Sequence, residues 1–183
     1  MLSNSLLSLP ILRFVTRRGL LTGAGALAAT AGSVSSVEAQ GAPSHLRFIN
    51  PNGIGKPNGY SHVVEMTGPG RTIYIAGQLG YDASGKRAGE VGDFQAQATQ
   101  VFENLKIALS VVGAGFEHVV KLNNYLTNIS NLPVFRTVRD KYITGSPPTS
   151  TTIEISKLAR PDALLEIEAI AVLAANAKVV PAR

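Results

Sequence analysis

Few side chains in this sequence are of the types that carry out chemistry, and their spacing excludes several kinds of site. The 183 residues include no cysteine, which excludes thiolate catalysis, disulfides and cysteine-ligated zinc. The histidines, at positions 45, 62 and 118, lie far apart and show no metal-ligand spacing. No Ser–His–Asp arrangement can be assembled. The run Ser150-Thr151-Thr152 offers hydroxyls for a neutral or phosphorylated ligand, although hydroxyl-rich strand starts are usually structural.

Residues 1–39 have the three parts of a secretory signal. A basic head, a mildly apolar run and small residues at the −3 and −1 cleavage positions follow one another: Arg13, Arg17 and Arg18, then residues 20–31, then Val37-Glu38-Ala39. Arg17-Arg18 gives the head a twin-arginine pattern, typical of Tat export. The apolar run is shorter than the roughly 20 residues that span a membrane. We predict a cleaved Tat signal, a periplasmic or secreted protein and no stable membrane association afterwards. The alternatives are a basic tail without structure or a membrane anchor.

The remainder has the length of one compact domain. We expect an irregular lead-in at 40–56, the domain at 57–175 and a tail at 176–183. Residues 1–39 hold three of the 17 basic residues and one of the 12 acidic ones, so the mature balance is 14 against 11. The basic residues are scattered, and no row of aromatic residues at base-stacking spacing accompanies them. We therefore expect no nucleic-acid partner.

The hydrophobic pattern predicts the elements that position these groups. In chain order we expect strands at 61–66 and 72–78, a helix at 94–112, a strand at 118–127, a helix at 131–142, and strands at 151–156 and 165–173. Asp93 is placed to cap the first helix, and Gly113 to end it. The order ββαβαββ predicts an α+β fold in which both helices cover one face of a sheet.

The other face of that sheet has no helix to cover it. On the last strand, Glu166, Glu168, Ile170 and Val172 share one side and Leu165, Ile167, Ala169 and Ala171 the other. On the strand at 118–127, Lys121, Asn123 and Tyr125 alternate with a face made of Val120, Leu122 and Leu126. The side with Ile170, Val172 and Tyr125 would expose an apolar patch that monomers rarely tolerate. We therefore predict self-association.

Several segments resemble the Rid (reactive intermediate deaminase, or YjgF) family. Leu165-Glu166-Ile167-Glu168-Ala169-Ile170-Ala171 is similar to its closing E-I-E-A-I-A signature, Ile73–Gln78 to its early S-G-Q strand, and Val119–Leu126 to its V-K-x-x-V-x-L strand. Residues 97–105 fit its first helix. The loop Pro57–Ser61 resembles its P-Y-S loop, with Asn58 and Gly59 inserted. The likeness spans residues 50–173.

The resemblance implies a chorismate-mutase-like mixed sheet and a homotrimer with clefts between subunits. It implies a small-molecule ligand and hydrolysis of enamines or imines to 2-oxo acids and ammonia, as in 2-iminobutanoate/2-iminopropanoate deaminases, without metal or cofactor. An iminium carbon is already electrophilic, so such a site needs only to bind the substrate, position one water molecule and transfer protons.

The family's residues carry over unevenly. Tyr60 matches a cleft tyrosine, Gly77 the backbone position beside the substrate, and Glu166 the carboxylate near the reacting water. Ala76 replaces a serine. The arginine that pairs with the substrate carboxylate in the family corresponds to Ser150 here, a loss of about 1.5–3 kcal/mol in binding. We expect Ser150 and Thr151 to contact substrate.

Arg139 stands at a family asparagine, and we hypothesise that it anchors the substrate anion in place of the missing arginine. The alternative is a solvated helix arginine paired with a nearby acid. Glu166 and Glu168 have an alternative as well, as carboxylates that line a barrel and hold subunits together. Tyr60 has the alternative of packing its loop against a neighbour.

The sequence is therefore consistent with three functions. The first is an imine hydrolase of the deaminase type, with Glu166 and Gly77 at the reacting centre and Tyr60, Ala76, Arg139, Ser150 and Thr151 around the substrate. The second is a homotrimer that binds a small metabolite without turnover, favoured by the missing arginine and by export. The third is an endoribonuclease or translation inhibitor, for which the scattered basic residues give little support.

Overall fold

The computed structural model describes residues 45–177; the predicted export signal and the last residues of the predicted tail lie outside this range. The elements in chain order are β1 (Leu46–Ile49), β2 (Val63–Met66), β3 (Gly70–Leu79), α1 (Phe94–Ser110), β4 (Val119–Leu126), α2 (Leu132–Tyr142), β5 (Thr149–Glu154) and β6 (Leu165–Ala174), with short 3-10 turns at Phe116–His118 and Ile129–Asn131. From β2 onward this is the predicted ββαβαββ order. No helix within 45–177 is long and apolar enough to cross a membrane.

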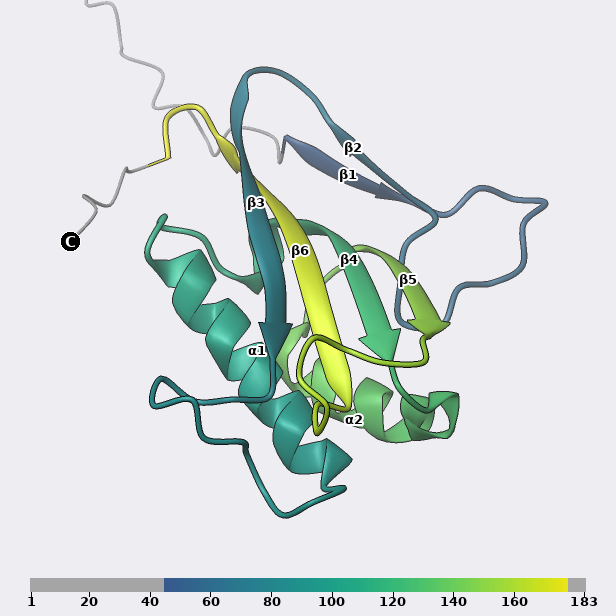
Figure 1. Ribbon diagram of the computed structural model, residues 1–183. Helices are drawn as coiled ribbons and strands as arrows, with labels where there is room; N and C mark the ends of the chain where they lie inside the picture. The colour runs from purple at the N-terminus through teal and green to yellow at the C-terminus, as the bar shows by residue number, and fades with distance from the viewer. Residues whose placement is uncertain (1–44, 178–183) are drawn as a thin grey trace, which may run out of the picture. The chain divides into compact units, whose positions relative to one another are not determined.

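The main sheet is mixed and has the strand order β3-β6-β4-β5. The strand β6 runs antiparallel to both β3 and β4, whereas β4 and β5 are parallel. Parallel neighbours need a crossover connection, and here α2 provides it. Figure 1 shows α1 and α2 together behind the sheet, with β3 and β5 at its two edges. The predicted α+β fold with both helices on one face is confirmed.

The helix α1 begins and ends at the residues that the sequence indicated. The Asp93 carboxylate accepts a hydrogen bond from the Ala96 amide at 2.9 Å, which satisfies one of the free amides of the first turn. Gly113 takes a left-handed conformation, with φ of 76°, as expected for the residue that terminates a helix. Ala98, Val101 and Leu105 share one face of the helix and are fully buried.

Alternate residues of β6 form the floor of the core. Leu165, Ile167, Ala169 and Ala171 pack against residues of α1, α2 and β4. In β4 a register irregularity between Val119 and Lys121 makes Val119 the core residue, 1 % exposed, and leaves Val120 only half-buried. The prediction had placed Val120 on the core face, and the irregularity is the reason that it was wrong there.

The opposite face of the sheet is only partly bare. Tyr74 is 78 % exposed there, but Val172 is only 5 % exposed. The predicted exposure of Val172 is therefore wrong, because the end of β2 and the start of β3 cover it: the space beside Gly70 is bounded by the Met66 sulfur and by Val172. We call the uncovered part, which carries Tyr74, Tyr125, Glu166 and Glu168, the open face.

The lead-in predicted to be irregular contains a strand. Residues of β1 pair antiparallel with β2, from Leu46 opposite Met66 to Ile49 opposite Val63. A strand of four residues that runs into Asn50-Pro51-Asn52-Gly53 carries little periodic signal. The strand β1 could therefore be predicted only once its pairing with β2 is known.

Candidate active site

A pocket between α2 and the start of β5 gathers most of the predicted substrate-binding residues. Its volume is about 380 Å³, and its lining residues are Asn58, Tyr60, Leu132, Arg136, Arg139, Ser150, Thr151 and Thr152. We call it the α2–β5 pocket. Of the residues predicted to contact substrate, it brings together Tyr60, Arg139, Ser150 and Thr151. Ala76 is not part of it.

The loop Pro57–Ser61 is held against the residues that precede β5. Ser61 is 1 % exposed; its amide donates to the Pro148 carbonyl at 2.9 Å and its hydroxyl to the Pro147 carbonyl at 2.6 Å. Both bonds join segments that are more than 80 residues apart in sequence. They fix the neighbouring Tyr60 beside the first residues of β5.

Arg139 is a buried and immobilised cation. The residue is 5 % exposed, its Nε donates to Asp140 Oδ1 at 2.8 Å, and its Nη2 lies 2.7 Å from the same oxygen. Its guanidinium carbon lies 5.9 Å from the centre of the Phe135 ring, within cation–π range. A Cβ added to Gly59 would lie 1.9 Å from Nη2, so the guanidinium occupies space that only glycine leaves open. The alternative of a solvated arginine is half right: the acid partner is present, but the side chain is buried.

A buried amide organises the hydroxyl groups of β5. Asn124 is fully buried, and its Nδ2 lies 3.1 Å from the Thr151 carbonyl, 2.9 Å from Ser150 Oγ and 3.0 Å from Thr152 Oγ1. The carbonyl only accepts, which identifies this atom as the amide nitrogen. An amide nitrogen does not accept, so both hydroxyl hydrogens point elsewhere. Ser150 and Thr152 line the α2–β5 pocket and can donate into it.

The open face holds the predicted catalytic carboxylate. Glu166 stands on β6 next to Gly77, in the stretch where the β3–β6 register is interrupted between Ile75 and Gln78. A Cβ on Gly77 would meet Glu166 Oε1 at 1.8 Å, so the carboxylate fills the space of the missing side chain. Ala76, also in the irregular stretch, is exposed. The predicted trio of Ala76, Gly77 and Glu166 is thus brought together.

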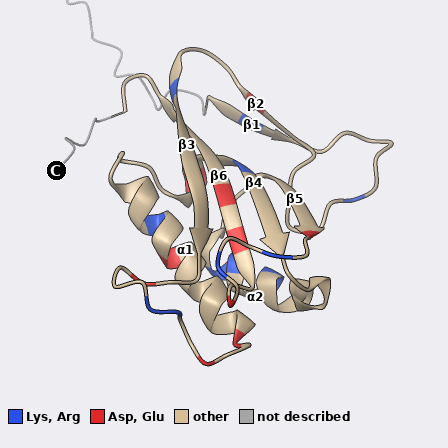
Figure 2. Ribbon diagram, in the orientation of Figure 1, with Lys and Arg blue, Asp and Glu red and all other residues tan. Residues whose placement is uncertain are grey.

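The surroundings of Glu166 disfavour its charge. Burial, and then repulsion from Glu168, raise the pKa of the Glu166 carboxyl. No hydrogen bond to its carboxylate is formed within residues 45–177. Glu168 differs, because it accepts from the Tyr125 hydroxyl at 3.0 Å and from Asn123 Nδ2 at 3.3 Å. The red segments on β6 in Figure 2 mark this acidic stretch on the central strand.

Within one chain the two groups of predicted site residues do not meet. Glu166 projects from the open face, on the side opposite to the β6 residues that pack against the helices. The α2–β5 pocket lies at the β5 edge, and β4 separates β5 from β6. The carboxylate and the cationic pocket therefore form two separate groups within one chain, which we call the β3–β6 half-site and the α2–β5 pocket.

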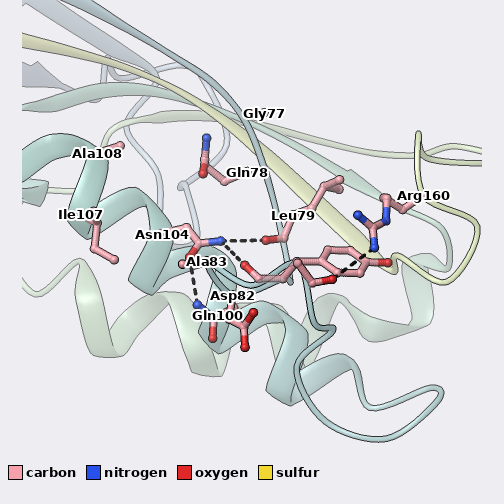
Figure 3. Close-up of a pocket in the computed structure, with 12 residues that line it drawn as sticks. Gly77, Gln78, Leu79, Asp82, Ala83, Gln100, Asn104, Ile107, Ala108 and Arg160 are labelled. Atoms are coloured by element: carbon pink, nitrogen blue, oxygen red, sulfur yellow. Dashed lines mark hydrogen bonds between the residues drawn. The ribbon is translucent and has the colours of Figure 1, made fainter.

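A second cavity was not foreseen from the sequence. It measures about 610 Å³ and lies between the end of β3, the loop after it, and α1. Figure 3 shows how its polar side chains bind one another and the backbone. Asn104 Nδ2 donates to the carbonyls of Leu79 and Tyr81, at 3.0 and 2.8 Å, and Asn104 Oδ1 accepts from Gln100 at 2.9 Å. These groups are already satisfied, which favours a role in shaping the β3–α1 connection.

Comparison with known proteins identifies the family. Residues 52–173 match the family model described as Endoribonuclease L-PSP, which covers well over half of the chain. The chain belongs to this family, the Rid family. No group of three or more His, Asp or Glu side chains placed to hold a metal ion occurs within residues 45–177.

Individual relatives agree with the Rid assignment. Protein DfrA of Myxococcus xanthus is 36% identical over 113 residues, covering 62% of this chain and 84% of that protein. The 2-iminobutanoate/2-iminopropanoate deaminase of Mus musculus is 34% identical over 115 residues, covering 62% of this chain and 80% of that protein. The crystal structure of a Rid-family protein of unknown function from Yersinia pestis, YyfB, superposes with a TM-score of 0.65 at 37% identity, covering 70% of this chain and 99% of that one.

Most of the departures from the Rid pattern that the sequence revealed lie together in space, whereas Ala76 lies apart from them on β3. The inserted Gly59 contacts the guanidinium of Arg139, which stands where the pattern has asparagine. Ser150, which stands where the pattern has arginine, lines the same pocket. Sequence reasoning missed two further residues, Arg136 and Asn124. Helical spacing from Arg139 would have found the first, and the apolar alternation of Leu122 and Leu126 the second.

Proposed function

We propose that this Rid protein is a hydrolase of the enamine/imine deaminase type, which converts an imine and water into a carbonyl compound and ammonia. The observation that carries the proposal is the Glu166 carboxylate, held against Gly77 with a raised pKa and free of hydrogen-bond partners within the described chain. A carboxylate of raised pKa is a stronger base than an ordinary one and takes a proton from water more readily.

The hydrolysis needs one residue that transfers protons, and Glu166 can do this in both steps. Glu166 takes a proton from a water whose oxygen bonds to the iminium carbon, and the C=N pair of electrons moves to nitrogen. The resulting carbinolamine carries OH and NH₂ on one carbon. Glu166 returns its proton to the nitrogen, the C–N bond breaks, ammonia leaves, and loss of the hydroxyl proton leaves a C=O group. The backbone of Gly77, at the β3 irregularity, lies beside this carboxylate.

The anion anchor comes from the α2–β5 pocket, and we propose that a second copy of the chain supplies it. A homotrimer in which the β3–β6 half-site of one copy faces the α2–β5 pocket of the next completes the site. Two observations support this arrangement. Tyr74 on the open face is 78 % exposed, and the two half-sites lie toward different edges of the sheet, one on β3 and β6 and the other at β5.

The test is ammonia release from freshly generated imines, measured on the mature protein. We expect turnover in the parent protein and a rate lower by at least about 10²-fold in Glu166→Gln. We also expect Arg139→Met to be impaired, and a co-refolded mixture of Glu166→Gln with Arg139→Met to regain part of the activity, because some interfaces then pair two intact half-sites. No regain in mixtures shown to exchange subunits would contradict a shared site.

A second function is supported by specific substitutions. Ser150 in place of the pattern's arginine and Ala76 in place of its serine remove a cation and a hydroxyl from the family site. A homotrimer that retains a small metabolite without hydrolysing it is consistent with both. Binding of 2-oxo acids without ammonia release across charged and neutral imines would favour this function over hydrolysis.

We further propose that the protein acts outside the cytoplasm after Tat export. The support is sequence alone: the Arg17-Arg18 pair, the apolar run and the cleavage pattern at Val37-Glu38-Ala39. Mass spectrometry of the protein from a periplasmic or culture fraction should find a mature N-terminus at Gln40. Replacement of Arg17-Arg18 by a pair of lysines should keep the precursor in the cytoplasm.

A further inference from the structure

The α2–β5 pocket carries two cations and no acid among its lining residues. Arg136 and Arg139, three residues apart on α2, both face it. Asp140 pairs with Arg139 through Nε and Nη2. The Nη1 group of Arg139 and the whole guanidinium of Arg136 have no hydrogen-bond or ion-pair partner within residues 45–177. The pocket thus presents more positive charge than one carboxylate neutralises.

The remaining polar groups of the pocket act as donors as well. Asn124 Nδ2 lies within hydrogen-bond distance of Ser150 Oγ and Thr152 Oγ1 and cannot accept from either, so each hydroxyl can turn its hydrogen toward a ligand. Tyr60 adds a phenolic O–H from the Pro57–Ser61 loop. A site built from two guanidiniums and three hydroxyl donors matches a ligand with many acceptor oxygens and more than one negative charge.

From this arrangement we propose that the α2–β5 pocket selects substrates with two carboxylates, namely 2-imino acids whose side chain ends in a second carboxylate. The proposal rests on the imine hydrolase function and names its substrate class. Arg139, immobilised by Gly59, Phe135 and Asp140, binds one carboxylate, and the half-buried Arg136 binds the other. The planar guanidinium of Arg136 can bind a carboxylate through two parallel hydrogen bonds, whereas Arg139 offers its Nη1 group. The volume, about 380 Å³, lies within the usual range of roughly 300–1,000 Å³ for small-molecule sites.

A ligand with one carboxylate would leave the second guanidinium partly desolvated and unpaired, which costs binding free energy. Discrimination between the two ligand classes should therefore reside in Arg136. A charge-assisted contact of this kind corresponds to about a tenfold difference in affinity or more.

The experiment measures binding of stable 2-oxo acids to the full mature protein by calorimetry, so that it does not depend on turnover. The probes are 2-oxobutanoate, with one carboxylate, 2-oxoglutarate, with two, and inorganic phosphate. We expect 2-oxoglutarate to bind at least about tenfold more tightly than 2-oxobutanoate, and Arg136→Gln to reduce that ratio to about one. Lys141→Gln is the matched control, because Lys141 is an exposed cation on the same helix that does not line the pocket.

Three results would overturn the proposal: equal affinity for the two oxo acids, an equal loss in Arg136→Gln and Lys141→Gln, or tighter binding of phosphate than of 2-oxoglutarate. Far-ultraviolet circular dichroism shows whether Arg136→Gln is folded, and Arg136→Lys, which keeps the charge, should retain part of the preference. A preference for 2-oxoglutarate without ammonia release from any imine would refute the hydrolase while leaving the dianion pocket intact. Turnover without that preference would refute only the pocket's selectivity.

Discussion

Asp162, in the loop before β6, and Glu166, the second residue of β6, are carboxylates four residues apart whose environments are opposite. Asp162 accepts hydrogen bonds from the Tyr81 hydroxyl and, at 2.8 Å, from Arg87 Nη1. The Tyr81 bond, followed by the one from Arg87, lowers the pKa of Asp162. Glu166 has no such donor within the described residues, and burial next to Glu168 raises its pKa.

The difference separates a carboxylate that holds the fold together from one that is available to a ligand. Charged groups whose hydrogen bonds are complete stabilise the structure, and those left incomplete in a partly buried position mark candidate sites. The arginines divide in the same way. Arg87 is paired with Asp162, whereas Arg136 lines a pocket without a partner in the described chain.

The largest effect on the rate should come from neutralising Glu166, and the matched comparison is neutralisation of Asp162. Glu166→Gln keeps the shape of the side chain but removes its base, so ammonia release should fall by about 10²- to 10⁴-fold. Asp162→Asn should leave the rate near that of the parent protein. Steady-state rates on one imine, measured for both variants, test the pair. Equal losses in the two variants would mean that Glu166 has no special chemical role.

Gly77 offers a way to move the Glu166 carboxylate without removing it. An added methyl would lie 1.8 Å from Glu166 Oε1, and its three nearest atoms all belong to that flexible side chain. We expect Gly77→Ala to displace the carboxylate and lower the rate by about 10²-fold, as misplacement by about 1 Å can do, with little change in melting temperature. Gly145→Ala is the control, because nothing lies within 4 Å of its added Cβ. An unchanged rate in Gly77→Ala would argue against a reacting centre at this position.

The same carboxylates should give opposite pH dependences of stability. Folding lowers the pKa of Asp162. The Asp162 carboxylate therefore stabilises the protein at pH values above 3.8, its ordinary pKa, and this stabilisation is lost as the pH falls through the lower pKa of the folded state. Because the pKa of Glu166 is raised, the folded state binds the proton more tightly, and stability falls as pH rises from 4.5 through the higher folded pKa. Asp162→Asn should lower the melting temperature at pH 7, and Glu166→Gln should not. Thermal unfolding from pH 3 to pH 8 tests both signs.

The sequence predicted the long elements because their periodicity is repeated many times. The helix α1 and its Asp93 cap, the alternation along β6 and the two-helix cover of one face could all be derived from it. It failed where a partner strand decides the outcome: β1 is only four residues long, and Val172 is covered by Met66 from another strand. The grouping of Tyr60 with Arg139 and Ser150 came from the family resemblance. The sequence could not predict that Arg136 lacks a partner within the described residues, or that Asn124 contacts the hydroxyls of β5. Both depend on which side chains the fold brings next to them.

The smallest effect should come from Glu168, which acts on the pKa of Glu166 from a distance. Glu168→Gln keeps an oxygen for the Tyr125 hydroxyl but removes the charge that, after burial, raises the pKa of Glu166. The acidic limb of the rate profile reports ionisation of the base, so it should move to lower pH, while the rate on the plateau above that limb should change little. Glu103→Gln is the matched control on the helix side, where Glu103 accepts from the Tyr142 hydroxyl at 2.8 Å, and it should leave the limb in place. A limb that stays put in Glu168→Gln, or moves equally in both variants, would show that Glu166 is not the group whose ionisation limits the rate.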